Sequence, residues 1–478
     1  MSDKKIIELE FKKLTPKVRK SFIRYLTQNE YPYKKYIIAF VEFLHVKPNS
    51  SRGEVFKKMF GSVPFNNQKI YELTSWTNNL LDRFLVEKYL EENPLERAQF
   101  VIKSYNNYIS ENLSSNKLSS LKQKSKKVVK DADYFRIQNF ILHEEDKLSL
   151  QRETRRQDNL LQQKSDYLNL YFFSEKLKDA CEMINRQNIV NIAYTPMFVD
   201  EVVGYIEANS SKFEKHLHVW VYYLIYNMLR TKEQVFFDDV VERATRGNVT
   251  KHFKKEELKD VFNYLQNFCV YNINQGVSSF LQKLFDIYSF QIEHDLFLDE
   301  KQHITQWDYK NIITIGLRLQ NTEWTYNFLH GYKKHLREEF KENAFNYNLA
   351  NFYYETNNLK QAKQHLLKVN FSDVYYNLSA RAILLKVYYE EEDTEALFAL
   401  IEATNNFLKR NKLVSAYQKR AYKNLFSFTK RMHLTRISSF TRKDKKFMDK
   451  VQKLKEKIEI EQEIANKSWV LSCLLKYT

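Results

Sequence analysis

The sequence predicts an all-α protein, for reasons of composition and of hydrophobic spacing. Only 7 glycines and 6 prolines occur among 478 residues, whereas the tight turns that join strands consume both residue types. These low counts argue against an all-β or a doubly wound α/β chain. Hydrophobic residues make up 43% of the chain, and they recur at three- and four-residue steps, as in helices that bury one face. So apolar a chain is expected to fold.

The predicted helices fall into five consecutive segments. A domain of compact helices is expected first, and its opening helix should begin at Pro16 after a Thr15 cap. A Lys- and Ser-rich stretch then predicts a linker or a mobile helix. Helical hairpins, a repeat region and a basic helix with capping helices follow. The segments are 1–112, 113–131, 132–308, 309–410 and 411–478.

The region from Tyr309 to Arg410 contains an internal repeat with a period near 34 residues. Two sets of residues fall in register at steps of 34 and 35: Gly316, Ala350 and Leu385, then Phe328, Ala362 and Leu397. This pattern resembles the tetratricopeptide repeat, in which small residues let two antiparallel helices approach closely. The resemblance implies a right-handed α-solenoid. The N-terminal domain and the abundance of Lys, Asn, Tyr and Phe also resemble uncharacterised helical proteins from the Bacteroidota.

The same resemblance implies a groove for a partner protein. In a solenoid of this kind the first helix of each pair lines the concave face, which holds a peptide or a helix. The residues expected to face the groove are Lys310, Gln320, Asn351, Tyr354, Lys386 and Tyr389. Tyr354 and Tyr389 are the preferred anchors, because tyrosine provides contact area at a low entropic cost. The leading interpretation is therefore a non-enzymatic scaffold or adaptor.

Positive charge is concentrated locally and supports an alternative. The net formal charge is +17, and the stretch from Lys409 to Lys455 holds 16 Lys and Arg against two Asp. Such a strip suits the phosphates of a nucleic acid, although charged helical faces are also often simply solvated. Contacts to the phosphates are expected from Arg436, Arg442, Lys443, Lys445 and Lys446. Nucleic-acid binding is thus the alternative function.

Several chemistries are excluded by what the sequence lacks. The closest pair of glycines, Gly53 and Gly61, is eight residues apart, so the P-loop, the dinucleotide-binding fingerprint and the nucleophile elbow cannot occur. Cys181, Cys269 and Cys473 lie too far apart for a disulfide framework or a paired-cysteine zinc site. No catalytic residue, metal or cofactor is predicted. An enzyme on a helical scaffold is the third class considered.

The sequence also bears on location. The opening residues, MSDKKIIELEFKK, lack the hydrophobic core of a signal peptide. The longest apolar run, from Val219 to Tyr226, is far shorter than the roughly 18 residues that a membrane span needs. A cytoplasmic protein without a membrane span is therefore expected.

Overall fold

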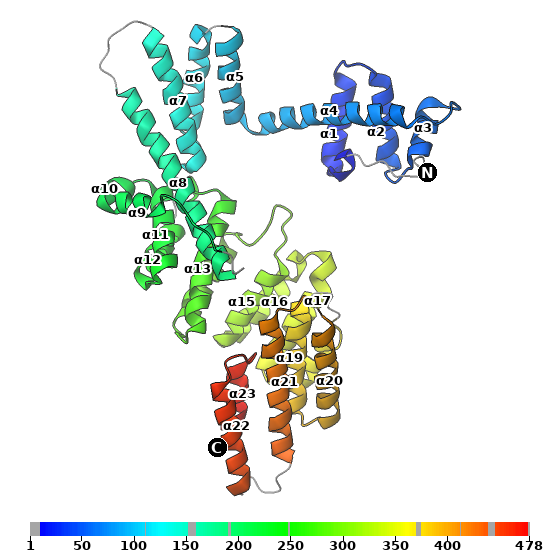
Figure 1. The fold of residues 1–478 in the computed structure, drawn as a ribbon, viewed down its shortest axis with the longest axis vertical. Helices are drawn as coiled ribbons and strands as arrows, with labels where there is room; N and C mark the ends of the chain where they lie inside the picture. Colours follow the sequence, from blue (N-terminus) through cyan, green and yellow to red (C-terminus); the bar gives the residue numbers. More distant parts are fainter. Residues whose placement is uncertain are drawn as a thin grey trace. The chain divides into compact units, whose positions relative to one another are not determined.

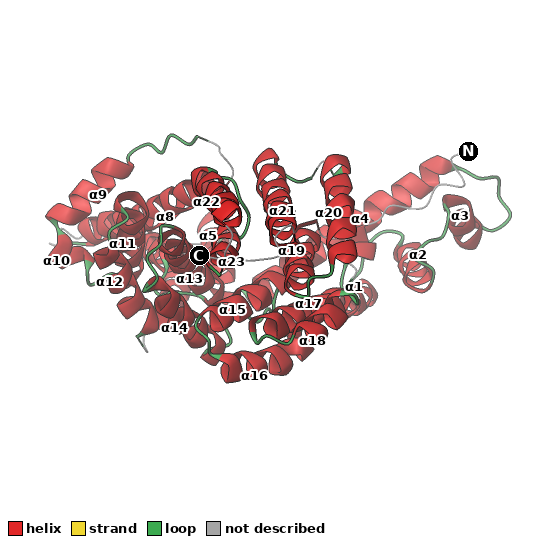
Figure 2. Cartoon of the chain, turned by 90° about the horizontal axis from the view of Figure 1, so that it is seen from below, coloured by secondary structure: helices red, strands yellow, loops and turns green. Residues whose placement is uncertain are grey.

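The structure is helical throughout the part of the chain that it describes. This computed structural model describes residues 10–109, 111–151, 159–189, 193–246, 249–369, 374–411, 413–437 and 445–476. Over these residues it contains 23 α-helices and no strand (Figures 1 and 2), with one isolated bridge between Ile304 and Leu336. The all-α class is confirmed. None of the helices in these ranges is both long and apolar enough to cross a membrane.

The chain forms two compact units, residues 1–176 (unit 1) and 177–478 (unit 2). The division falls inside α8 (Leu160–Ile189) and not in the Lys- and Ser-rich stretch. That stretch contains α6 (Glu111–Ser125), which packs against α5 (Pro94–Tyr108) and α7 (Ala132–Gln151). Its Leu118 and Leu121 are buried in a small core with residues of α5 and α7. The stretch is therefore a packed helix up to Ser125 and non-helical from there to residue 131.

The first four helices of unit 1 share one aromatic-rich core. They are α1 (Pro16–Gln28), α2 (Lys34–Val46), α3 (Arg52–Phe60) and α4 (Asn67–Glu92). Helix α1 begins as the sequence predicts, because the Thr15 side chain accepts a hydrogen bond from the Val18 N–H and Pro16 is the first helical residue. This core contains large side chains such as Phe22, Phe40 and Phe84, all of which are buried.

Unit 2 is built of helices that pack as consecutive pairs. Its helices after α8 are α9 (Val199–Ala208), α10 (Ser210–Phe213), α11 (Leu217–Thr231), α12 (Gln234–Thr245), α13 (Lys255–Asn274), α14 (Phe280–Glu293), α15 (Gln306–Arg318), α16 (Thr322–Tyr332), α17 (Glu338–Glu355), α18 (Leu359–Leu366), α19 (Val374–Glu390), α20 (Thr394–Arg410), α21 (Ala416–Ile437), α22 (Lys445–Ile460) and α23 (Lys467–Leu475). From α11 to α20 each odd-numbered helix packs on the even-numbered helix that follows it. The odd-numbered helices α15, α17, α19 and α21 also pack on one another in order. Unit 2 is thus a helical repeat-like fold. In each pair from α11–α12 to α19–α20 we call the odd-numbered helix the first helix and the even-numbered helix the second helix.

Three of these pairs close with the same turn. Gln320, Asn357 and Glu392 each end a first helix with φ between 60° and 61°, in the left-handed region. In each copy the next N–H donates to the carbonyl five residues earlier, at 3.0, 2.7 and 3.1 Å. This is the Schellman arrangement of a helix C-terminus. The turns in α15–α16, α17–α18 and α19–α20 therefore share one local geometry, and α13 ends in the same way at Gly276, where the Val277 N–H donates to the Asn272 carbonyl at 3.0 Å.

The turns correct the register of the repeat in its first copy. They follow one another by 37 and 35 residues, so the step of 34 from Gly316 to Ala350 is three residues too short. The structural counterpart of Ala362 and Leu397 is Thr325, five residues beyond the left-handed residue of the turn, and not Phe328. Gly316 packs directly against the Thr325 side chain. Residues three or four positions apart lie on the same face of a helix. The apolar pattern alone therefore could not determine the register between the first copy and the other two.

Replacing Gln320 with glycine is expected to stabilise unit 2 by about 1 kcal/mol. Gln320 is exposed and has φ 60°, a backbone conformation that costs residues other than glycine about 1 kcal/mol or more. Chemical denaturation of the full chain would measure the change. The control is Gln364→Gly at an exposed position of α18, where glycine should cost about 1 kcal/mol. Equal losses for both variants would contradict the left-handed turn.

Candidate partner-binding site

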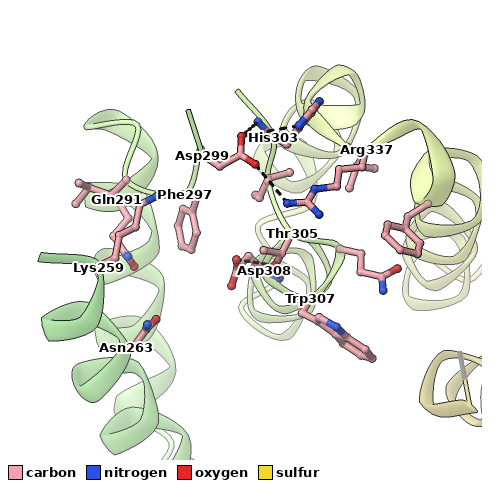
Figure 3. A pocket seen from close by; sticks show the side chains of 15 residues that line it. Lys259, Asn263, Gln291, Phe297, Asp299, His303, Thr305, Trp307, Asp308 and Arg337 are labelled. Carbon is pink, nitrogen blue, oxygen red and sulfur yellow. Dashed lines mark hydrogen bonds and ion pairs between the residues drawn. The ribbon is translucent and has the colours of Figure 1, made fainter. Parts of the chain in front are cut away.

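A pocket lies between the first helices of three successive pairs in unit 2. Its volume is about 360 Å³, and its walls come from α13, α14, α15, the start of α17 and the segment that joins α14 to α15. Figure 3 shows Lys259 and Asn263 of α13 on one side and Asp308 and Trp307 of α15 on the other. The pocket is therefore bordered by the first helices α13, α15 and α17, together with α14 and the segment that follows it.

The segment between α14 and α15 forms a fixed wall of this pocket. The Asp299 carboxylate accepts hydrogen bonds from the backbone N–H groups of His303 and Lys301, at 2.8 and 2.9 Å. These hydrogen bonds lower the pKa of Asp299, with the His303 N–H contributing most. The Ile304 N–H donates to the His335 carbonyl at 2.9 Å, which ties the segment to the short 3-10 helix (Lys333–His335) that precedes α17. The wall is thus held at several points by hydrogen bonds to its backbone.

The charged groups of the pocket differ in how fully they are paired. The Lys259 ammonium donates to the Leu298 carbonyl at 3.0 Å, and the Arg337 guanidinium donates to Asp299 at 3.4 Å. Asp308 accepts a hydrogen bond from the Thr305 hydroxyl at 2.7 Å, but it makes no ion pair with any described residue. Burial raises the pKa of Asp308. The charge of Lys259 acts in the opposite direction and lowers the pKa of Asp308.

Aromatic side chains continue from the pocket toward α19, but only Trp307 among them is exposed, since Tyr347 and Tyr376 are buried. Trp307 is 39% exposed at the edge of the pocket, and its ring centroid lies 4.9 Å from that of Tyr376. The ammonium of Lys310, one of the predicted groove residues, lies 5.1 to 5.8 Å from the ring centroids of Trp307, Tyr347 and Tyr376. It also donates to the Ser379 hydroxyl at 3.2 Å. Lys310 therefore lies beside the pocket and is held by these contacts.

Three other predicted groove residues lie beneath the chain's own last helix. The Lys386 ammonium lies 5.4 Å from the Tyr354 ring and 5.6 Å from the ring of Trp469 in α23. The Tyr354 hydroxyl donates to Glu390 at 2.6 Å. Tyr389 is only 3% exposed, and its ring meets that of Trp469 edge-on at 5.6 Å. Tyr389 is thus a core residue here and is not open to a partner.

Helix α23 covers this region because its apolar face belongs to a core that it shares with α19, α20, α21 and α22. Val470, Cys473 and Leu474 are buried together with residues of α19 and α21. Figures 1 and 2 show α22 and α23 on the side of α21 opposite to α20. Of the two remaining groove residues, Asn351 is half-buried in α17, and Gln320 lies exposed in the turn described above. The six predicted residues therefore do not form one open surface.

The predicted basic strip is only partly described. The Arg436 side chain is 12% exposed; its guanidinium donates to the Tyr389 carbonyl at 3.2 Å and forms an ion pair with Glu392. It is therefore engaged inside the protein and is not directed at a phosphate. Arg442 and Lys443 lie outside the described residues, and Lys445 and the exposed Lys446 begin α22.

A buried charged cluster in unit 2 was not anticipated from the sequence. One oxygen of Glu257 is 3.0 Å from the Tyr222 hydroxyl, 3.0 Å from His218 Nε2 and 2.9 Å from the Lys178 ammonium. His218 and Tyr222 are fully buried. Burial alone would raise the pKa of Glu257, but His218 and Lys178 stabilise the ionised form and lower it to about 2. The cluster joins α8, α11 and α13, and none of its members lines the pocket.

The described ranges hold no group of three or more His, Cys, Asp or Glu side chains arranged to bind a metal. No protein-family model, curated protein or solved structure matches this chain. The fold and the site therefore define a class: an all-α, helical repeat-like protein whose pocket is lined by both polar and apolar side chains of α13, α14, α15 and α17.

Proposed function

We propose that this protein is a non-enzymatic scaffold that binds a peptide or a helix of another protein at the pocket between its first helices. The observation that carries the proposal is the pocket itself, about 360 Å³ in volume and bordered by the exposed Trp307. Binding surfaces between proteins are typically anchored by an aromatic residue beside a pocket with a few polar groups. The tetratricopeptide-like interpretation is supported by the turn that three pairs share.

The proposed site lies closer to α13 than the sequence-based groove. Helix α23 covers Tyr354, Lys386 and Tyr389, whereas the pocket residues Asn263 and Trp307 are exposed. A partner therefore binds across α13, α15 and the start of α17, with Lys310 beside it. The part of the first helices that α23 covers, with Tyr354, Lys386 and Tyr389, instead stabilises the fold of unit 2.

The charges of the pocket favour a particular kind of anchor from the partner. Lys259 and Arg337 already donate to groups of the protein, while Asp308 is half-buried and lacks an ion pair among the described residues. A side chain that carries N–H donors, such as Lys or Arg, would supply Asp308 with a partner and could lie against the face of Trp307. We therefore expect a basic residue of the partner peptide to bind in the pocket.

Trp307→Ala is expected to reduce the capture of the partner at least tenfold, because aromatic anchors carry much of the energy of an interface. Tyr326→Ala is the matched control, since Tyr326 is 42% exposed against 39% for Trp307 but lies on the second helix α16. The measurement is affinity purification of the full chain and both variants from the native cell, followed by quantitative mass spectrometry. The proposed site would be contradicted if the partner co-purified with Trp307→Ala as well as with the wild type, or if both variants lost it equally.

Nucleic-acid binding through residues 409–455 remains the alternative proposal. Exposed lysines of α21 and α22, such as Lys423, Lys430 and Lys446, support it, while Arg436 is engaged internally. Nuclease treatment during the purification separates the two functions. Proteins held through nucleic acid would be lost after the treatment, whereas a directly bound partner would remain.

A further inference from the structure

An exposed strip of aromatic side chains runs across α2, α3 and α4 in unit 1, apart from the proposed scaffold site. We call Tyr33, Tyr36, Phe60, Lys69 and Trp76 the aromatic strip. The rings of Tyr33 and Trp76 stack with their centroids 4.1 Å apart and their planes 4° from parallel. Those of Tyr36 and Phe60 stack at 6.1 Å, and the Lys69 ammonium lies 5.4 Å from the Phe60 centroid. The strip thus consists of two groups of contacts, Tyr33 with Trp76 and Tyr36 with Phe60 and Lys69, and its two tyrosines lie three residues apart at the start of α2.

The two tyrosines of the strip remain largely open to solvent. Tyr33 is 56% exposed and Tyr36 is 50% exposed, although each packs one side of its ring on a neighbour. Tyr33 also has φ 61°, a conformation that tyrosine rarely adopts. The backbone thus holds its ring over Trp76 at a conformational cost. Phe60 and Trp76 are partly buried against the core of unit 1 and support the two exposed rings.

Positive charge surrounds the strip. Lys35 and Lys57 are exposed beside Tyr36 and Phe60, and neither makes an ion pair with any described residue. Between Glu10 and Glu92 the sequence has 15 Lys and Arg against 9 Asp and Glu. Two acidic residues lie near the strip, Glu30 and Glu72; Glu30 pairs with Lys34, and Glu72 accepts a hydrogen bond from Gln68. The balance of charge therefore favours a polyanion.

We propose that the aromatic strip binds single-stranded nucleic acid. Bases stack on the open sides of Tyr33 and Tyr36, and Lys35, Lys57 and Lys69 contact the phosphates. Every base has a flat π-face, so a row of aromatic rings flanked by cations binds single strands with little dependence on sequence. In a duplex the bases already stack on one another and cannot reach the rings. An acidic peptide could form ion pairs with the lysines, but its carboxylates have no flat ring that could stack on the tyrosines.

The first test measures the binding of fluorescein-labelled oligo(dT) and oligo(U) to the full chain by fluorescence anisotropy at low salt. Tyr33→Ala and Tyr36→Ala are each expected to weaken binding about tenfold, as stacking contacts usually contribute. Tyr108→Ala is the control, because Tyr108 is 84% exposed in α5 outside the strip. Thermal unfolding of each variant shows that it is folded. The absence of binding, or equal binding of a duplex of the same length, would overturn the proposal.

The second test uses exposed lysines whose replacement leaves the core intact. For single strands the slope of log affinity against log salt is about −0.7 for each phosphate neutralised. A variant with Lys35→Gln, Lys57→Gln and Lys69→Gln should therefore show a slope smaller in magnitude by about 2. A matched variant with Lys423→Gln, Lys430→Gln and Lys446→Gln in the C-terminal strip should keep the wild-type slope. If only the second variant changes the slope, binding belongs to the C-terminal strip and the proposal fails.

Discussion

Glu257→Ala is expected to lower the free energy of unfolding of unit 2 by about 3 to 5 kcal/mol, the usual cost of removing one partner from a buried charged cluster. The substitution leaves His218 and Tyr222, both fully buried, without the carboxylate that they contact. Lys178 can turn toward water, because its side chain is 39% exposed. Most of the cost therefore comes from the two buried groups. Urea denaturation of the full chain measures it.

The control for this prediction is Glu256→Ala. Glu256 is the preceding residue in the first turn of α13 and is exposed, so its loss should cost less than about 1 kcal/mol. Equal losses of stability in the two variants would show that Glu257 contributes only as a negative charge at the N-terminus of α13 and not through its contacts with His218 and Tyr222.

The contribution of Glu257 should also depend on pH in a defined direction. Its pKa is about 2 in the folded protein, below the ordinary value of 4.5. A lowered pKa stabilises the fold fully above the ordinary value, and that stabilisation is lost as the pH falls toward the folded value. The difference in stability between the wild type and Glu257→Ala should therefore narrow between about pH 4.5 and pH 2. A difference that stays constant over this window would contradict the assigned charge state.

Gly316→Leu is expected to destabilise the α15–α16 pair by about 3 kcal/mol, toward the upper end for overpacked helix contacts. A side chain at this position would overlap the Thr325 hydroxyl and would lie 3.4 Å from the Trp324 ring. Thr325 is fully buried and cannot move into solvent. Thermal unfolding of the full chain would show the loss as a lower melting temperature.

Two further variants establish that the crossing itself is responsible. Gly331→Ala lies in the same pair, at a helical position with open space around it, and should be neutral or stabilising by up to about 1 kcal/mol. Adding Thr325→Ala to Gly316→Ala should recover stability relative to Gly316→Ala alone, since it removes the overlapping hydroxyl. A double variant as unstable as the sum of the two single variants would place Gly316 and Thr325 out of contact.

The helical class and several helix starts could be predicted because the signals are local. The Thr15 cap, Pro16 and the apolar spacing lie within single helices, and so does the apolar face of α23 with Val470 and Leu474. The register of the repeat was less accessible. Its turns use Gln320, Asn357 and Glu392 in a left-handed conformation where glycine is the usual signal.

Neither the buried charged cluster nor the pocket could be predicted, because each depends on residues brought together by the tertiary fold. Lys178 and His218 lie 79 and 39 residues from Glu257, and each is an ordinary residue in its own helix. The pocket likewise joins Lys259, Trp307 and Arg337 without any sequence motif. The groove prediction assigned Tyr354 and Tyr389 to an open face, since nothing in the sequence indicates which face α23 covers.

The most direct test of the scaffold account is whether a bound partner shields the pocket. The native cysteines Cys181, Cys269 and Cys473 are all buried, and burial raises the pKa of Cys269 to about 12, so a cysteine introduced on the surface can be labelled selectively with a maleimide. Asn263→Cys places it in the pocket, and Lys360→Cys places it on the second helix α18, both at exposed positions.

The labelling rates are then compared with and without the partner obtained by affinity purification. The account predicts that the partner slows labelling at position 263 at least tenfold and leaves position 360 unchanged. Unchanged labelling at position 263, or protection at position 360 alone, would contradict binding between the first helices.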